Sequence, residues 1–325
     1  MRLNSFLSLV EIRTKIASMI PFSLGTVYAL YRFNRFEVRN FILFFISLLA
    51  FDMVTTALNN YYDYKRAKKK HGYNYEKHNA IVRYDLKEST VIAVIAILLS
   101  IAVISGLLLF LNTSVILLLI GAASFAIGIA YSFGPVPISR MPLGEVFSGF
   151  FMGFVIVFLS VFIHVYDLNI VSIMLEGQVM SLSVNVVEVI YIFLFSVPAV
   201  LGIANIMLAN NICDMDDDIE NKRYTLPIYI GKDKALLIFR VLYYIAYVDL
   251  VVLSILKVIP FLALLSILTL ITVNKNIKLF NEKQTKKDTF ILSVRNFVFI
   301  SGSLLLLLGV SSIPLLFGSL VTGKL

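Results

Sequence analysis

Two stretches of the chain repeat a pattern of amides and acids, N-N-x-x-D. The first runs from Asn59 to Asp63; the second runs from Asn210 to Asp214 and is followed by Asp218. Residues four apart share a face of a helix, so each motif would present its amide and its acids on one side. Oxygen donors of this kind suit Mg²⁺, which binds carboxylates together with substrate phosphates. The predicted metal ligands are Asn59, Asn60, Asp63, Asn210, Asp214 and Asp218.

Two such clusters that face each other would hold Mg²⁺ around a diphosphate. The metal would neutralise the leaving group as a C–O bond breaks, and nearby Lys and Arg side chains would add fixed positive charge. The alternative for a single acid is an ordinary solvated helix end, which fits Asp216 and Asp217. Two copies of the motif at the ends of two apolar segments are harder to explain in this way, because polar groups at membrane depth are costly unless paired or liganded.

Two further acids lie within or beside apolar segments. Asp52 lies two turns before the first motif on the same helical stripe, where it would join the polar site or hydrogen-bond a neighbouring helix through Thr55 or Thr56. Glu145 opens another segment, where it would favour the helix N-terminus by its charge or touch a substrate. Both pairs of alternatives stay open, whereas a lone His164 near the far end of that segment is expected to be structural.

The segments that must position these residues are long and apolar. The chain has 325 residues, 59% of them hydrophobic, and a mean hydropathy of +0.90, whereas soluble domains are about 45–50% apolar. Apolar runs of about 18 or more residues are typical of membrane-spanning helices. We therefore predict an all-α multi-pass membrane protein, a single domain over 1–325. Its nine spans are expected near 16–33, 40–62, 89–111, 114–132, 144–166, 187–212, 236–255, 258–274 and 291–318.

The net charge of +8 would suggest nucleic acid as a partner of a soluble protein. In a membrane protein it is better explained by the excess of Lys and Arg in cytoplasmic loops. With the N-terminus inside the cell, both motifs would lie at the cytoplasmic face of the cell membrane, with the lipid bilayer as partner and no nucleic acid. Of the 28 Lys and Arg residues, only Arg32, Arg35, Arg39, Lys257 and Lys324 would then lie outside.

Four runs resemble the UbiA superfamily of membrane prenyltransferases. They are NNYYDYKRA (59–67), NAIVR (79–83), GIAYSFGPVPISRMPLGEVFSG (128–149) and NNICDMDDDIENKRYTLPIYIG (210–231). They are most similar to the branch that prenylates 1,4-dihydroxy-2-naphthoate in menaquinone synthesis. The resemblance implies a nine-helix bundle around a central cavity open to the cytoplasm. It also implies Mg²⁺-dependent transfer of a polyprenyl group from a polyprenyl diphosphate to an aromatic acceptor, with loss of the acceptor's carboxylate to give demethylmenaquinone.

The resemblance also implies roles for individual residues. Asn59, Asp63, Asp214 and Asp218 match the catalytic, metal-binding positions of the family. The residues expected to bind the diphosphate are Arg13, Lys65, Arg66, Arg83, Tyr131, Ser132, Lys222 and Arg223. For the basic residues in the loops, ordinary cytoplasmic charge remains an alternative explanation.

The first motif departs from the family pattern. Asn60 stands where the family has an acid, and Ala67, Lys68 and Lys69 occupy the stretch where a further acid is usual. The first motif thus retains a single carboxylate, so metal affinity there should fall, or lysine charge should replace that of a metal. By its position alone, Glu76 is a possible substitute ligand.

Other functions remain open at this level. The same chemistry could act on 4-hydroxybenzoate or on another small aromatic acceptor. Polar residues in membrane spans together with an internal repeat are also features of transporters. A non-catalytic homologue is a third alternative, favoured only by the missing acids of the first motif.

Overall fold

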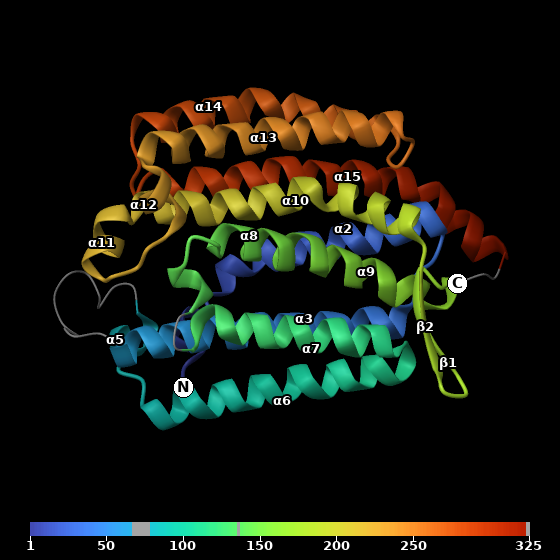
Figure 1. The fold of residues 1–325 in the computed structure, drawn as a ribbon, viewed down its shortest axis with the longest axis horizontal. Coiled ribbons are helices and arrows are strands. Elements are labelled where there is room, and N and C mark those ends of the chain that lie inside the picture. Colours follow the sequence, from blue (N-terminus) through green and yellow to red (C-terminus); the bar gives the residue numbers. More distant parts are fainter. Residues whose placement is uncertain (67–78, 135–136, 323–325) are drawn as a thin grey trace. The chain divides into compact units, whose positions relative to one another are not determined.

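The computed structural model of the 325-residue chain describes residues 1–66, 79–134 and 137–322. These residues form two compact units, each assembled from separate stretches of the chain. Unit 1 comprises Met1–Met19 and Ile42–Pro137, and unit 2 comprises Ile20–Phe41 and Ile138–Leu325. Both units are built mainly from helices (Figure 1). The single domain expected over the whole chain stays a prediction.

Unit 1 carries the first acidic motif. Its elements are α1 (Leu3–Leu9), η1 (Ile12–Lys15), the first turn of α2 (Ile16–Phe33), most of α3 (Val38–Arg66), α5 (Ala80–Arg83), α6 (Glu88–Asn112) and α7 (Val115–Ser132). Ser47 of α3 donates a hydrogen bond to the carbonyl of Ala102 in α6 at 2.8 Å. The rings of Phe51 in α3 and Phe125 in α7 stack with centroids 3.9 Å apart. The helix that carries the first motif therefore packs against both α6 and α7.

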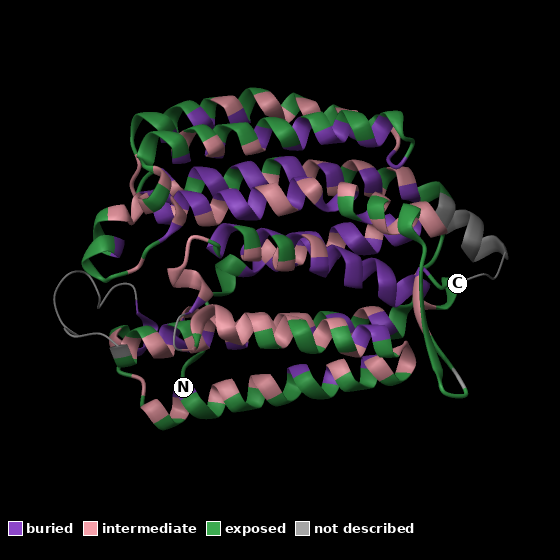
Figure 2. Cartoon of the chain, in the orientation of Figure 1, coloured by how far each residue is buried: buried purple, intermediate pink, exposed green. Residues whose placement is uncertain are grey.

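Unit 2 carries the second motif. Its elements are the rest of α2, η2 (Ile138–Arg140), α8 (Gly144–Ser148), the π-helical turn η3 (Gly149–Val155), α9 (Ile156–Val165), η4 (Tyr166–Leu168), β1 (Val171–Glu176), β2 (Val179–Val184), α10 (Val186–Cys213), α11 (Met215–Glu220), α12 (Leu226–Ile230), α13 (Lys232–Ile255), η5 (Phe261–Thr269), α14 (Leu270–Glu282) and α15 (Phe290–Thr322). Helix α10 is central to this unit, because it packs against η3, α13 and α15. Buried residues line these facing sides (Figure 2).

Close packing in unit 2 depends on small residues, as is usual where membrane helices approach each other. A Cβ atom placed on Gly153 would lie 2.5 Å from the Cα of Val200 in α10, and one on Gly25 would lie 2.5 Å from the carbonyl oxygen of Val157. Backbone atoms cannot move aside as the end of a flexible side chain can. These two glycines therefore fix how closely η3 approaches α10 and how closely α2 approaches α9.

Within the described residues, eight helices are long and apolar enough to cross a membrane. They correspond to eight of the nine predicted spans, and the prediction of an all-α multi-pass membrane protein is confirmed. The remaining range, 16–33, is helical over its whole length as α2, but this 18-residue helix contains Pro21 and ends with Arg32 in its last turn, and it is not among the eight.

One element was not expected. Strands β1 and β2 form an antiparallel hairpin, with Val171 opposite Val184 and Glu176 opposite Val179. Gly177 has a φ of +64° in the two-residue connection, a conformation that glycine adopts without steric cost and that tight hairpins need. The hairpin occupies a segment that was predicted only as a loop between two spans.

Candidate diphosphate and metal site

The second motif spans the junction of α10 and α11. Asn210 and Asp214 face each other as their spacing predicts, because the Asn210 amide nitrogen lies 3.4 Å from Asp214 Oδ2. Lys286 reaches the same pair from the connection between α14 and α15. Its Nζ lies 2.8 Å from Asp214 Oδ2 and also donates a hydrogen bond to Asn210 Oδ1. A positive group is thus held between the two oxygens that were predicted to bind a metal.

Asp218, the last acid of this motif, is buried with only 2% of its surface exposed. Thr225 Oγ1 donates to its Oδ2 at 3.1 Å. The Nε of Arg223 lies 3.3 Å from its Oδ1, close enough for an ion pair but without hydrogen-bond geometry. Burial raises the pKa of the Asp218 carboxyl, and the charge of Arg223 and the Thr225 hydroxyl oppose that rise. A nearby cation would favour the ionised form further.

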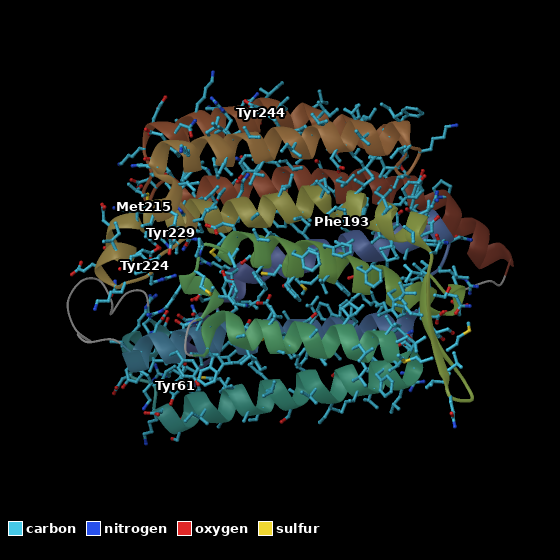
Figure 3. The ribbon with its side chains drawn as sticks, viewed as in Figure 1. Tyr61, Phe193, Met215, Tyr224, Tyr229 and Tyr244 are labelled. Atoms are coloured by element: carbon cyan, nitrogen blue, oxygen red, sulfur yellow. The ribbon has the colours of Figure 1, made fainter. Side chains whose placement is uncertain are left out.

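The chain after α11 turns back so that Arg223 can reach Asp218. Lys222 adopts a left-handed conformation with a φ of +55°, and the Arg223 backbone nitrogen donates to the Asp218 carbonyl at 2.8 Å. This is the arrangement of a Schellman cap, in which the residue after the helix is left-handed. Arg223 also donates to the Ser139 carbonyl at 3.3 Å, so the segment around η2 is fastened to the same turn. Met215, Tyr224 and Tyr229 lie at this end of unit 2 (Figure 3).

Glu145 connects α8 to the second motif. It is 5% exposed, and its Oε1 accepts a hydrogen bond from the amide of Asn211 at 2.8 Å. Its Oε2 is buried and has no hydrogen-bond partner among the described residues. The two alternatives for Glu145 were a favourable charge at its own helix N-terminus and a contact with substrate. The structure shows a third interaction, a hydrogen bond with the helix that carries the second motif.

In the first motif the two adjacent amides point in different directions. Asn59 is exposed and Asn60 is buried. The Asn60 amide nitrogen donates to the Leu9 carbonyl and to Glu11 Oε1, both at 3.1 Å. Glu11 has a φ of +47°, which is uncommon for a residue other than glycine. Asn60 therefore fastens a left-handed turn between α1 and η1, and its role as a metal ligand stays a prediction.

The carboxylate of Asp52 is bound by two residues near the N-terminus of the chain, Lys15 and Ser18. Lys15 Nζ lies 2.6 Å from Asp52 Oδ1 and 2.5 Å from Thr56 Oγ1, and Ser18 Oγ lies 2.5 Å from Asp52 Oδ2. Lys15 is buried, and a buried ion pair of this kind needs such additional hydrogen bonds to offset its desolvation. Of the two alternatives for Asp52, the structure supports a bond to a neighbouring helix, made by Lys15 and Ser18.

The other residues predicted to bind diphosphate have varied surroundings. Lys65 pairs with Glu88 at 2.7 Å, and the Arg83 guanidinium lies 5.3 Å from the ring centroid of Tyr84. Arg13, Asp63, Lys65, Arg83 and Lys222 are exposed, as Asn59 is, and Tyr131 and Ser132 are half-buried. The side chain of Arg66 lies outside the described part of the structure, as do Ala67, Lys68, Lys69 and Glu76. All these roles stay predictions.

No local signal in the sequence singles out Lys286. It stands in the run NEKQTKKDT, where lysines and acids alternate with amides as in any hydrophilic loop. Only its folded position beside Asp214 distinguishes it from Lys283, which pairs with the exposed Asp288 at 3.1 Å. For Glu145 the sequence indicates only a position at the start of its own helix, and the hydrogen bond from Asn211 joins it to a residue 66 positions away in the chain.

Comparison with known proteins assigns the family. Residues 18–302 match the model of the UbiA prenyltransferase family. The chain belongs to the UbiA prenyltransferase family. It is also 32% identical over 235 residues to 1,4-dihydroxy-2-naphthoate octaprenyltransferase of Bacillus subtilis (strain 168), an alignment that covers 72% of this chain and 68% of the relative. The protein is therefore a membrane prenyltransferase, as its motifs implied.

Solved structures agree on the fold of this UbiA-family member. A UbiA homologue from Aeropyrum pernix K1 in its apo form superposes with a TM-score of 0.64 at 19% identity, covering 89% of this chain and 97% of that one. A UbiA homologue from Archaeoglobus fulgidus bound to DMAPP and Mg²⁺ superposes with a TM-score of 0.61 at 13% identity, covering 95% and 99%. At these identities the likeness concerns the fold.

The donors of the second motif are amide and carboxylate oxygens, the kind of ligand that a divalent cation such as Mg²⁺ prefers. An amide oxygen and a carboxylate oxygen already hold the ammonium of Lys286 between them. Among the described residues no group of three His, Cys, Asp or Glu side chains lies together, so the motif would supply only part of a coordination shell. This is common for Mg²⁺, which keeps several waters and takes phosphate oxygens from its substrate.

Proposed function

We propose that this UbiA-family protein transfers a polyprenyl group from a polyprenyl diphosphate to 1,4-dihydroxy-2-naphthoate, with decarboxylation to the hydroquinone form of demethylmenaquinone, which dioxygen oxidises to demethylmenaquinone. The observation that carries the proposal is the 32% identity to the Bacillus subtilis octaprenyltransferase over 72% of this chain. The geometry of the second motif supports it, because Asn210 and Asp214 already bind a cationic group. Mg²⁺ bound there would neutralise the negative charge that develops on a departing diphosphate.

The chain's own residues have distinct tasks in this proposal. The proposed metal ligands are Asn210, Asp214 and Asp218 in the second motif and Asn59 and Asp63 in the first. Arg223 favours the ionised form of the buried Asp218 by its charge, and its backbone nitrogen closes the turn after α11. The basic residues predicted at the site would then bind phosphate oxygens that the metal leaves free.

The bond changes follow from the chemistry of the two substrates. The allylic C–O bond breaks and the diphosphate leaves with the bonding electrons. The electron-rich ring attacks the allylic carbon through the position that carries the carboxylate, and loss of CO₂ restores the aromatic ring as a prenylated hydroquinone. The polyprenyl tail would stay in lipid beside the apolar surfaces of the spanning helices, because keeping apolar surface away from water is favourable.

The test uses membranes that contain the full chain, geranylgeranyl diphosphate, Mg²⁺ and either 1,4-dihydroxy-2-naphthoate or 4-hydroxybenzoate. Products are identified by mass spectrometry. Asp214→Ala removes a proposed metal ligand, and Asp217→Ala is the matched control, because Asp217 is an exposed acid of the adjoining short helix α11. The expected result is a decarboxylated, prenylated naphthohydroquinone, or the naphthoquinone that air oxidation makes from it, that is lost only in Asp214→Ala.

The other outcomes are equally informative. Prenylated 4-hydroxybenzoate without a naphthoquinone product would retain prenyl transfer and contradict the proposed acceptor. Equal product from Asp214→Ala and Asp217→Ala would contradict the role of the second motif. No product from either acceptor, with folded protein in the membrane, would contradict the proposed acceptor and favour a different acceptor or a non-catalytic role.

We also propose that the N-terminus and both motifs lie on the cytoplasmic side of the cell membrane. The support is the distribution of Lys and Arg, which gather in the loops that this orientation places inside. The chain has a single cysteine, Cys213, so Cys213→Ser gives a cysteine-free background. Ser181→Cys and Glu220→Cys, both at exposed positions, can then be introduced and labelled one at a time. Labelling of intact cells by an impermeant thiol reagent should occur at position 181 and be absent at position 220, and the reverse pattern would contradict this orientation.

A further inference from the structure

The connection between α14 and α15 is a tightly bonded loop. The Thr285 carbonyl accepts from the backbone nitrogens of Thr289 at 3.1 Å and Phe290 at 3.0 Å, and the Thr285 backbone nitrogen donates to Thr289 Oγ1 at 2.9 Å. The Gln284 side chain donates to the Phe280 carbonyl at 2.6 Å, which ties the loop to the end of α14. These bonds fix the backbone on both sides of Lys286. The loop therefore presents this lysine from a defined position.

Lys286 differs from Lys283, another lysine of this loop, in what it contacts. Lys283 pairs within the loop, with Asp288. Lys286 instead reaches across to the end of α10, where its ammonium contacts Asp214 Oδ2 at 2.8 Å and also Asn210 Oδ1. Its side chain is 45% exposed, so the ammonium group can leave this position without breaking a packed core.

The position of the ammonium group has a consequence for ligand binding. An amide oxygen and a carboxylate oxygen four residues apart are the donors proposed to bind Mg²⁺, and a lysine ammonium is a compact single charge that such donors also accept. A divalent cation between them would repel the ammonium. A diphosphate that arrives with the metal would offer it charged oxygens nearby, and charge-assisted bonds of this kind are among the strong ones in proteins.

We propose that Lys286 is a diphosphate-binding residue whose ammonium occupies the cation position between Asn210 and Asp214 in the free protein and turns to phosphate oxygens when the substrate binds. The inference rests on the proposed function and extends it, since it adds a basic residue from the connection between α14 and α15 to a site built from other loops. It makes Lys286 a competitor of the metal in the free protein and a ligand of the substrate in the complex.

The test measures binding on the purified full chain in lipid nanodiscs. Free Mn²⁺, a spectroscopic substitute for Mg²⁺, is followed by electron paramagnetic resonance without diphosphate. Binding of radiolabelled geranylgeranyl diphosphate is then measured at saturating Mn²⁺. Lys286→Gln and Lys286→Ala are compared with wild type and with Lys283→Gln, the matched lysine of the same loop, and thermal unfolding confirms that each variant is folded.

The expected result is a pair of opposite changes. Both Lys286 variants should bind Mn²⁺ about tenfold more tightly and geranylgeranyl diphosphate about tenfold more weakly, the size expected for one charge-assisted hydrogen bond. Lys283→Gln should behave as wild type. A merely structural role of Lys286 would weaken both bindings together, and that result, or unchanged binding of geranylgeranyl diphosphate, would overturn the inference. Wild type that binds neither ligand would contradict the proposed function itself, before any variant is compared.

Discussion

The two N-N-x-x-D motifs are alike in sequence and in the use of their second amide, and they differ in the surroundings of their first amide. In unit 2, Asn210 and Asp214 point to one side and hold a positive group, and Asp218 is buried beside Arg223. The second amides are used alike, because Asn60 donates to Glu11 in unit 1 and Asn211 donates to Glu145 in unit 2. Asn59, the counterpart of Asn210, is exposed. The same letters at the same spacing thus serve internal structure through the second amide in both units, and only the first amide and the acid of unit 2 hold the ammonium of Lys286.

The contact between Asn60 and Glu11 also gives a physical reason for an amide at position 60 of the first motif. The resemblance to the family leads us to expect an acid at position 60, but the neighbour of Asn60 in space is Glu11, whose Oε1 lies 3.1 Å from the Asn60 amide nitrogen. A carboxylate at position 60 would face a second carboxylate, which is unfavourable at such short range. An amide can donate to Glu11, so Asn60 and Glu11 form a compatible pair that an acid would disrupt.

The largest expected effect is a loss of prenyl-transfer activity on substitution of an acid in the second motif. Asp214→Asn should lower prenyl transfer at least about 100-fold, because it removes the charge of a proposed metal ligand from a set with few acids. The melting temperature should change little, since the lost ion pair with Lys286 is partly exposed. Product formation in membranes and thermal unfolding of the purified protein give the two readings. Activity within a fewfold of wild type would mean that the second motif is not the metal site.

The next effect is on stability in the first motif. Asn60→Ala should reduce the free energy of unfolding by about 1–3 kcal/mol, because it leaves the buried Leu9 carbonyl without its donor. Asn59→Ala, at the exposed neighbouring position, is the control. It should leave the free energy of unfolding unchanged while lowering prenyl-transfer activity. Denaturant titration in detergent measures the first quantity. If Asn60→Ala changed the Mg²⁺ requirement but not the stability, the structural role assigned to Asn60 would be wrong.

A smaller effect tests the pair of Asn60 and Glu11. Asn60→Asp restores the family's acid and should destabilise the protein by about 1–2 kcal/mol, the cost of placing a buried polar group against a partner that cannot donate to it. Adding Glu11→Gln supplies a donor and should recover most of the loss. The test compares the melting temperatures of the wild type, the Asn60→Asp variant and the double variant. Equal melting temperatures for Asn60→Asp and wild type would show that Glu11 does not constrain position 60.

The smallest effect concerns an exposed ion pair of unit 1. The side chains of Lys65 and Glu88 are 45% and 42% exposed, and exposed pairs contribute little to stability. Lys65→Gln should therefore leave the melting temperature unchanged. A selective fall in affinity for geranylgeranyl diphosphate would favour the predicted role of Lys65 in diphosphate binding, whereas unchanged affinity would favour ordinary cytoplasmic charge.

Much of the fold could be predicted because the relevant signals are local. The range 16–33 coincides with α2, and 187–212 lies within one residue at each end of α10. Long apolar runs bounded by polar residues leave few alternatives once the membrane is inferred. The hairpin at 171–184 was missed because its alternation is short and lies between two much stronger signals.

The sequence by itself determined the membrane class, the helical segments and the pairing of Asn210 with Asp214, since hydropathy and four-residue spacing act within a single helix. Only the tertiary structure decided which polar groups meet across the chain. Lys286 lies 76 residues from Asn210 and Asn60 lies 51 residues from Leu9, and no local pattern distinguishes these side chains from their neighbours. Their roles follow from packing, which brings a particular donor to a particular acceptor and leaves an adjacent residue of the same type exposed.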